Sequence, residues 1–361
     1  MTNMITEETL NAEIAWKSEP QVLLQRSAFR VQRFLLHCLS MMELEFRPPH
    51  QPWVLAGQIE HLVADLTVKI AGDVTLDTLQ KKLAEADQWL PMDGPGDWSV
   101  ASLLNLNSTG PLRLGFGAWR DLLLGVQFLN GNGELVTAGG IPLKNVAGYD
   151  LGKFMVGQAE VFGKIVAIIT RTYRRPSGAI LAKFAPEAKL LSRLLVTPCR
   201  PTWAISTRDH LLLGYLGNEA DLEFFGKSLR HYDPDDIRKM NLDEEIKYRR
   251  ELWRPAGPWG KWPWVFRASV PPARVMDFVQ SAGVDNWVAD AAFGIVLGGT
   301  DERLAPAFRG AAASMGGSLQ CRSAADGSLV ALTMNPEEKI AIEKLKNAFD
   351  PEKKLTTMPR S

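Results

Sequence analysis

Residues 139–151 read Gly-Gly-Ile-Pro-Leu-Lys-Asn-Val-Ala-Gly-Tyr-Asp-Leu, and this stretch is the most informative in the chain. Its three glycines, lone lysine and Tyr-Asp pair make it too polar for a core element, and such loops usually hold a ligand or form a tight tertiary turn. Backbone amides near Gly148 can face an anion, and Lys144 can supply a point charge to a phosphate. The alternative is a structural loop in which Asn145 and Asp150 hydrogen-bond their own backbone. The pattern alone leaves both interpretations open.

Regular elements are expected on both sides of this loop. Alternating apolar residues predict a strand over 65–72, and leucines at helical spacing predict a helix over 74–86. The tetrad Asn-Gly-Asn-Gly at 130–133 predicts a hairpin turn, because asparagine and glycine accept the positive φ that such turns require. The other expected strands cover 122–129, 134–138 and 164–173. The chain therefore combines strands and helices around a polar, glycine-bearing loop.

Lys144 to Asp150, Lys-Asn-Val-Ala-Gly-Tyr-Asp, followed by Met155-Val-Gly157 and Gly163, resembles the FAD-binding domain of the vanillyl-alcohol-oxidase-like, PCMH-type flavoproteins. Within them it is most similar to the family of bacterial glycolate oxidase E subunits. The resemblance runs from about residue 65 to the Leu345–Pro351 segment near the C-terminus. It implies that FAD is the cofactor and that these residues hold it: Lys144, Asn145, Gly148, Tyr149, Asp150, Gly157 and Gly163.

The resemblance also implies an architecture and an assembly. We expect an α+β fold with a two-part α/β FAD-binding domain, an antiparallel-sheet cap domain, and a C-terminal helix and tail that return to the flavin domain. The expected boundaries are a divergent N-terminal helical block at 1–50, the FAD-binding-type domain at 51–176, the cap at 177–334 and the C-terminal segment at 335–361. The implied partners are the flavin-containing and iron-sulphur subunits of a glycolate oxidase complex, which converts glycolate to glyoxylate.

Three segments depart from the family pattern where glycine-rich loops would contact the FAD diphosphate. The first loop is replaced by Gln25–Arg30, in a stretch that reads as helical. The second, Thr-x-Gly-Gly in the family, stands here as Ser99–Ser102, and Gly-Thr-Leu-Gly stands as Glu160–Gly163. Glu160 thus puts a carboxylate where a diphosphate would lie. The alternative function is therefore a degenerate, FAD-poor scaffold that keeps the fold for complex assembly.

Composition narrows the class of protein. A chain of 361 residues exceeds a single core of roughly 250–300 residues, so two domains are expected. Its 41 basic and 41 acidic residues leave no net charge, which argues against a nucleic-acid partner. No apolar run approaches the roughly 20 residues of a transmembrane segment, and residues 1–17 are too acidic for a secretory signal. We expect a cytoplasmic protein, or one attached peripherally to the inner membrane.

The remaining candidate sites are weaker. The cysteines and histidines lack metal-site spacing, so no metal is expected. The charge run 233–250 is interpreted as a solvated helix face, and the Trp-rich segment 253–264 as a packed loop beneath the cap rather than a partner surface. Arg267 is a possible substrate-carboxylate ligand, although a salt-bridged structural role is favoured. No residue qualifies as the general base of catalysis.

Overall fold

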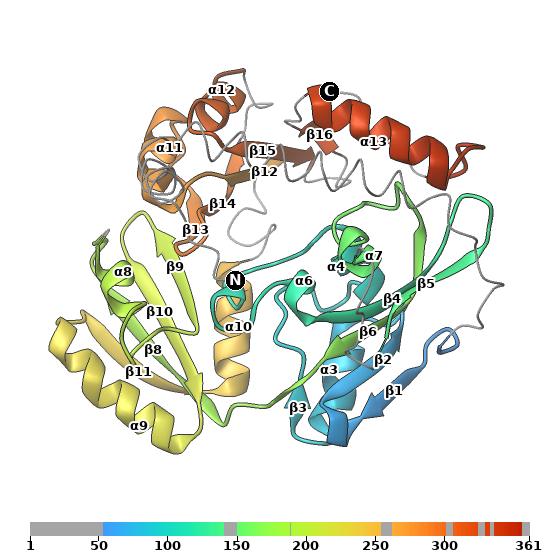
Figure 1. Ribbon diagram of the computed structural model, residues 1–361. Helices are drawn as coiled ribbons and strands as arrows, with labels where there is room; N and C mark the ends of the chain where they lie inside the picture. Colours follow the sequence, from blue (N-terminus) through green and yellow to red (C-terminus); the bar gives the residue numbers. More distant parts are fainter. Residues whose placement is uncertain are drawn as a thin grey trace, which may run out of the picture.

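The computed structural model describes residues 53–140, 150–187, 189–253, 262–300, 306–323, 329–332 and 336–355. Consecutive stretches of this chain form two antiparallel sheets surrounded by helices (Figure 1). The five-stranded sheet uses strands between residues 59 and 171, and the nine-stranded sheet uses strands between 178 and 332. The α+β class and the antiparallel sheet in the second half are thus confirmed. The exact domain boundaries stay a prediction.

The five-stranded sheet has the order β1-β2-β6-β4-β5. Its central strand β6 pairs with both β2 and β4. On β2, the apolar side chains of Val68 and Ile70 stand at alternating positions and are fully buried. The helix expected over 74–86 is α3, Leu76–Ala84, whose N-terminus is capped by the side chain of Thr75. The strands are β1 (Ile59–Leu62), β2 (Thr67–Ala71), β4 (Leu123–Leu129), β5 (Leu135–Gly139) and β6 (Lys164–Arg171).

The hairpin between β4 and β5 forms where the sequence predicts it. Oδ1 of Asn130 accepts hydrogen bonds from the backbone amides of Asn132 at 3.0 Å and Glu134 at 2.9 Å. Gly133 has φ of 81°, a left-handed conformation that favours glycine. A short ladder of β3 (Gln88–Trp89) and β7 (Tyr173–Arg174) accompanies this half of the chain.

The nine-stranded sheet has the order β11-β8-β10-β9-β13-β14-β12-β15-β16. Helices α11 (Val275–Ser281) and α12 (Pro306–Ser314) pack on one face, over a core that includes Phe266, Ala268 and Val296. Its strands are β8 (Gly178–Phe184), β9 (Trp203–Thr207), β10 (Leu211–Gly217), β11 (Asp236–Asn241), β12 (Trp264–Ser269), β13 (Trp287–Asp290), β14 (Ile295–Thr300), β15 (Ser318–Ser323) and β16 (Leu329–Leu332). Helices α8 (Leu190–Leu194) and α9 (Glu219–Ser228) accompany β8 and β10.

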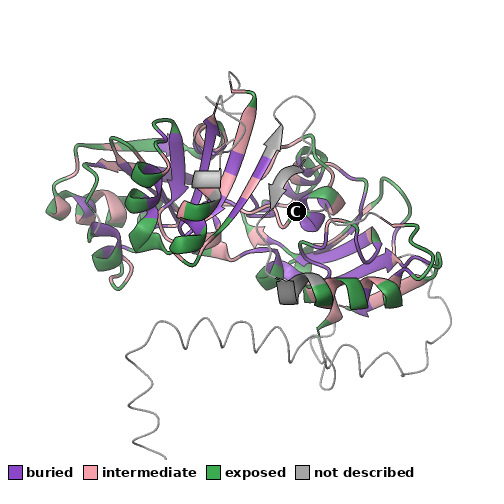
Figure 2. Cartoon of the chain, turned by 90° about the horizontal axis from the view of Figure 1, so that it is seen from above, coloured by how far each residue is buried: buried purple, intermediate pink, exposed green. Residues whose placement is uncertain are grey.

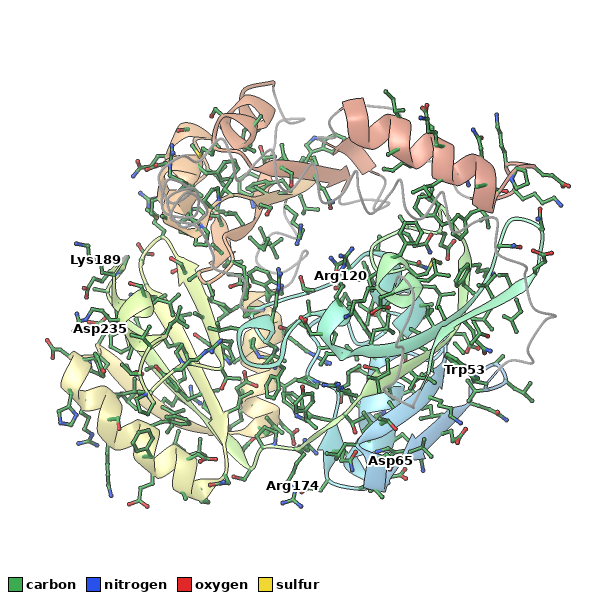
Figure 3. All side chains as sticks on the ribbon, viewed as in Figure 1. Trp53, Asp65, Arg120, Arg174, Lys189 and Asp235 are labelled. Atoms are coloured by element: carbon green, nitrogen blue, oxygen red, sulfur yellow. The ribbon has the colours of Figure 1, made fainter. Side chains whose placement is uncertain are left out.

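The two halves of the chain share a hydrophobic core, which the first half enters through β3 and the segment before α5 (Arg113–Phe116). Trp89 and Leu112 from the first half cluster with Trp203, Ile205 and Ile295 from the second, and all five are buried. Figure 2 shows the inner strands of both halves as buried and the outer helix faces as exposed. The chain crosses between the halves just after Arg174, which is labelled in Figure 3. The halves are therefore packed together as well as connected.

Helix α10, Leu242–Leu252, lies at the junction of the two halves and corrects one expectation. The charge run was expected to be a solvated face, but Glu245 and Arg249 are only 1% and 2% exposed. Arg249 donates hydrogen bonds to Glu245 Oε1 at 2.6 Å and to Asp93 of the first half, and Trp203 Nε1 donates to Glu245 Oε1 at 2.7 Å. The i,i+4 pair is buried because the face of α10 that carries it is covered by Asp93 and Trp203. Burial raises the pKa of Glu245 to about 8, against the hydrogen bond from Trp203.

The C-terminal helix α13, Pro336–Phe349, returns to the first half, as expected. Lys346 Nζ donates to the carbonyl of Val161 at 2.9 Å, and the amide of Gly131 donates to the carbonyl of Phe349 at 2.9 Å. The Phe349 ring packs near the Phe162 ring, with 5.7 Å between centroids. The C-terminal helix therefore packs against the 157–163 turn, which contains two of the expected cofactor residues.

Candidate functional site

The expected cofactor residues fall into two groups. Four of them, Lys144, Asn145, Gly148 and Tyr149, lie outside the described residues. The other three, Asp150, Gly157 and Gly163, are described and stand on the segment between β5 and β6. The geometry of the candidate site is therefore argued from this segment and from the helices beside it, α4 (Val100–Asn105) and α7 (Leu151–Phe154).

Asp150 is occupied by local contacts. Its Oδ1 accepts a hydrogen bond from the amide of Lys153 at 3.0 Å and so caps α7, and its Oδ2 lies 3.2 Å from Lys153 Nζ. Asp150 therefore caps α7, and both of these side-chain contacts are with Lys153.

The 157–163 turn is built around the buried side chain of Gln158. Gln158 Oε1 accepts from the amide of Phe162 at 2.8 Å, while Nε2 donates to the carbonyl of Gly163 at 2.7 Å and to Asn105 Oδ1 at 2.6 Å. The backbone adds hydrogen bonds from Gly157 to Leu104 and from Ala159 to Asn105, each 2.9 Å. The turn is therefore fixed to the C-terminal end of α4. Sequence reasoning missed Gln158 and Asn105, because a single amide side chain carries no spacing signal.

Gly157 and Gly163 are required for geometric reasons. Gly157 has φ of 83°, in the left-handed region. A Cβ on Gly163 would lie 2.4 Å from Phe128 Cδ2 and 3.0 Å from the carbonyl oxygen of Leu129, so only glycine allows the turn to approach β4 this closely. Both residues fix the shape of the turn that leads into β6.

Glu160 occupies the exposed apex of this turn. It has φ of 62° and follows Ala159, which has φ of 51°. Non-glycine residues rarely adopt this left-handed region, so the backbone keeps the conformation of a glycine while the side chain is a carboxylate. The carboxylate has one long hydrogen bond, from Asn105 Nδ2 at 3.4 Å. Glu160 therefore has a backbone conformation that favours glycine.

The Ser99–Ser102 segment forms the start of α4. Ser99 Oγ accepts from the amide of Ser102 at 3.2 Å and lies 2.9 Å from Ser102 Oγ. Ala101 donates its amide to the carbonyl of Gly72 at 3.0 Å, and a Cβ on Gly72 would come within 3.1 Å of the Ala101 Cβ. The Ser99 hydroxyl therefore caps α4, the Ser102 hydroxyl bonds to it, and Ala101 lies in close packing.

The backbone of these segments fits an FAD domain, and the side chain of Glu160 is the one feature of these described segments that opposes a bound diphosphate. Gly163 packs closely on β4, Gly157 is left-handed and α4 is capped, so the described segment has the glycine turns and the capped helix typical of such a domain. Glu160 adds a negative charge at the exposed apex, which would oppose a diphosphate bound beside it.

Three cap residues named from the sequence are also located. Trp253 is buried and donates its Nε1 hydrogen to the carbonyl of Thr109 at 3.3 Å, and Trp262 packs against the core shared by the two halves, so the described tryptophans are packed rather than free. Arg267 lies on β12. Within the part of the chain that the structure describes, its guanidinium has no carboxylate oxygen within 4.0 Å, so the favoured salt-bridged role was wrong.

Comparison with known proteins agrees with this geometry. Residues 55–149 match the FAD binding domain family. The chain is 30% identical over 127 residues to the glycolate oxidase subunit GlcE of Escherichia coli, and 30% identical over 130 residues to the glycolate oxidase subunit GlcD of Bacillus subtilis. These matches cover 34% and 35% of this chain, and 36% and 27% of the two relatives. The chain thus spans about a third of the length of these relatives.

More distant similarity is found both in sequence and in fold, and the likeness in fold covers more of the chain. The mitochondrial D-lactate dehydrogenase of Arabidopsis thaliana is 27% identical over 121 residues, which is 33% of this chain and 21% of that protein. A solved alkyldihydroxyacetonephosphate synthase aligns with a TM-score of 0.57 at 13% identity, over 80% of this chain and 64% of that one. No helix among the described residues is long and apolar enough to span a membrane, and those residues contain no cluster of metal-ligating side chains.

The sequence match over 55–149 covers four strands of the five-stranded sheet, and the 150–163 segment leads into its fifth strand, β6. The likeness in fold extends from that sheet into the nine-stranded one. The chain therefore carries an FAD binding domain, resembles glycolate oxidase subunits over about a third of its length, and shares the fold of alkyldihydroxyacetonephosphate synthase.

Proposed function

We propose that this chain is an FAD-binding subunit of a glycolate-oxidase-like complex, which assists the oxidation of glycolate, a 2-hydroxy acid, to glyoxylate. The observation that carries the proposal is the glycine-shaped turn at 157–163, held by Gln158 against α4 on a domain that matches the FAD binding family. The similarity to two different glycolate oxidase subunits supports membership of such a complex. Its partners are then a flavin-containing subunit and an iron-sulphur subunit.

The residues would share the work of holding the cofactor. Lys144 supplies a positive charge to a phosphate, Asn145 and Tyr149 supply polar side chains, and Gly148 allows the backbone to approach closely. Asp150 fixes the direction of the chain as it leaves this loop by capping α7. When bound, FAD supplies the acceptor for the hydride of the hydroxy acid. The chain offers no residue that we nominate as the general base.

The flavin content of the purified chain tests the proposal. We expect the full 361-residue chain to take up added FAD and to show the visible absorption band of oxidised flavin. The variant Lys144→Ala removes the proposed phosphate contact and changes no residue of the described framework. Its affinity for FAD should be lower than that of the unmodified chain. A chain that stays colourless at saturating FAD would contradict the proposal.

A second candidate function is favoured by Glu160. A carboxylate at the apex of the turn, together with Ser102 in place of glycine, fits a scaffold subunit that keeps the fold and its partner faces while another subunit performs the chemistry. Co-purification distinguishes the two functions. A scaffold would recover the flavin-containing and iron-sulphur subunits with or without bound FAD, whereas a cofactor subunit would give an inactive complex when its own FAD is absent.

The proposal includes a cytoplasmic location with peripheral attachment to the inner membrane. Attachment would come through the partner subunits, because the function proposed here is part of a larger complex. Fractionation of cells with and without those subunits tests this point. The chain should move from the membrane fraction to the soluble fraction when the partners are deleted.

A further inference from the structure

One face of the nine-stranded sheet carries charge where it meets the first half. Arg267 and Val288 both pair with Leu297 of β14. Asp290 pairs with Ile295, which lies two residues before Leu297 on β14. Side chains two residues apart on a strand share a face, so Arg267 and Asp290 stand on the same face as Val288, Ile295 and Leu297. The three apolar residues belong to the core shared with the first half. This face is therefore turned toward the first half.

A second guanidinium reaches this region from the opposite side. Arg113 is the first residue of α5, Arg113–Phe116, and its guanidinium carbon lies 4.2 Å from the centre of the Phe293 ring. Phe293 follows β13 and packs with the shared core. The next residue of α5, Leu114, is buried in the core of the second half, so this helix and its arginine are held in place. The cation over the aromatic face keeps Arg113 oriented.

The two arginines outnumber the carboxylate beside them. Asp290 is 1% exposed, and its Oδ1 accepts the amide hydrogen of Ala292 at 3.1 Å. Among the described residues, no carboxylate oxygen lies within 4.0 Å of the guanidinium of Arg113 or Arg267, and neither side chain has a hydrogen bond. Ten guanidinium hydrogens are thus left for a ligand or solvent, in a region where a charge loses much of its hydration.

The electrostatics of the three groups agree with this arrangement. Burial lowers the pKa of Arg267, Arg113 lowers it further, and Asp290 opposes both. Burial also raises the pKa of Asp290 to about 7, against the backbone hydrogen bonds that it accepts and the two arginines. Near neutral pH this carboxyl is therefore partly protonated, and it leaves a net positive charge between the halves.

We infer that Arg113 and Arg267 form a binding site for a small carboxylate anion between the two halves of the chain, with Asp290 beside it as a competing acceptor. A guanidinium presents its hydrogens as a planar fork that matches a carboxylate, and an anion between the two arginines would relieve their mutual repulsion. The site deepens the proposed function and rests on it only for the identity of the anion, a 2-hydroxy carboxylate. Arg267 lies on the cap sheet and Arg113 on the FAD-binding half, so such an anion would also hold the two halves together.

The test uses the full chain and glycolate as the probe. Isothermal titration calorimetry, with and without saturating FAD, should detect glycolate binding to the unmodified chain and none of its neutral amide, glycolamide. Arg267→Met should weaken glycolate binding at least tenfold, and Arg267→Lys should restore part of it because lysine keeps the charge without the fork. Arg208→Gln is the matched control, since Arg208 is an exposed arginine paired with Asp285 at 3.1 Å, and its affinity for glycolate should not change.

Three results would overturn the inference: an unchanged dissociation constant for glycolate in Arg267→Met, equal binding of glycolamide, or no binding of glycolate to the unmodified chain. A chain that binds glycolate through Arg267 and takes up no FAD would support the inference and defeat the proposed function. A chain that takes up FAD and binds no glycolate would do the reverse. If Arg267→Met unfolds, Arg113→Met replaces it, with the same tenfold loss expected, because Arg113 approaches from the other half of the chain.

Discussion

Substitutions at Ala159 and Glu160 can separate the effect of the Glu160 charge on FAD binding from the effect of the backbone conformation on stability. Both Ala159 and Glu160 have positive φ, 51° and 62°, and a non-glycine residue there costs about 1 kcal/mol. Because glycine also loses more entropy on folding, Ala159→Gly and Glu160→Gly should each raise the free energy of unfolding by only about 0.5 kcal/mol. Glu160→Gln keeps the backbone cost and should leave stability unchanged.

The affinity for FAD should respond in the opposite pattern. Two unit charges about 8 Å apart interact by about 2 kcal/mol at an effective dielectric of 20, and exposure to salt reduces this value. We therefore expect Glu160→Gln and Glu160→Gly to strengthen FAD binding by about tenfold, which corresponds to roughly 1.4 kcal/mol. Ala159→Gly changes no charge and should leave the affinity for FAD unchanged.

Urea denaturation gives the stabilities, and flavin fluorescence titration at low and high salt gives the affinities. The gain in affinity from Glu160→Gln should shrink at high salt, because screening weakens the repulsion that the substitution removes. The reasoning would be refuted by equal FAD affinities of the unmodified chain and Glu160→Gln at low salt. It would also be refuted if Ala159→Gly improved the affinity as much as Glu160→Gly, since the backbone would then be the cause.

Three further outcomes follow from buried charges. Asp290 and Glu245 have raised pKa values, about 7 and about 8, so each carboxyl stabilises the folded state at low pH and loses that contribution as pH rises from its unfolded pKa to its folded pKa. The unfolding free energy of the unmodified chain should therefore fall over that range, and Asp290→Asn and Glu245→Gln should each make the fall less steep by at most about 1.4 kcal/mol per pH unit. Urea melts from pH 4 to 9 measure this slope. Arg249→Met leaves two carboxyl groups buried at the junction without their cation and should lower the free energy of unfolding by about 3–5 kcal/mol. The control Arg250→Met removes an ion pair whose arginine is 27% exposed and should cost under about 1 kcal/mol. Equal losses of stability in thermal melts would contradict a structural role of the buried Arg249 ion pair. Asp350 is buried and accepts hydrogen bonds from Lys346 and from two backbone amides, so Asp350→Asn should loosen α13 and speed amide exchange there by about tenfold or more, consistent with a cost of roughly 1–3 kcal/mol; exchange that stays uniform would show that the helix docks without this contact.

Much of the local structure could be predicted because it depends on neighbours in sequence. The strand at 67–71, the helix at 76–84 and the hairpin at 130–133 follow from side-chain periodicity and from asparagine and glycine in the turn. The return of the C-terminal helix followed from family resemblance, and the contact between Lys346 and Val161 gives its physical basis. Glu160 was singled out from the same resemblance, and its positive φ explains why glycine suits that position.

The buried contacts between distant residues could not be predicted in this way. The charge pattern of α10 reads as a solvated helix, and only the packing of Asp93 and Trp203 against it makes Glu245 and Arg249 interior residues. The same holds for Gln158, whose amide organises a turn through Asn105 more than fifty positions earlier. A single polar residue has no periodicity, so its burial depends on which remote segment covers it.

The amino-acid sequence by itself determined the class of fold, four of the five strands of the first sheet and the relation to FAD binding domains, whereas the edge strand β1 was not predicted. Tertiary structure alone decided which charges influence one another, because Arg113 and Arg267 are more than 150 positions apart and come into the same region only when α5 packs against the second half. Electrostatic energy depends on distance and burial, and both are set by the packing of the two halves rather than by spacing along the chain.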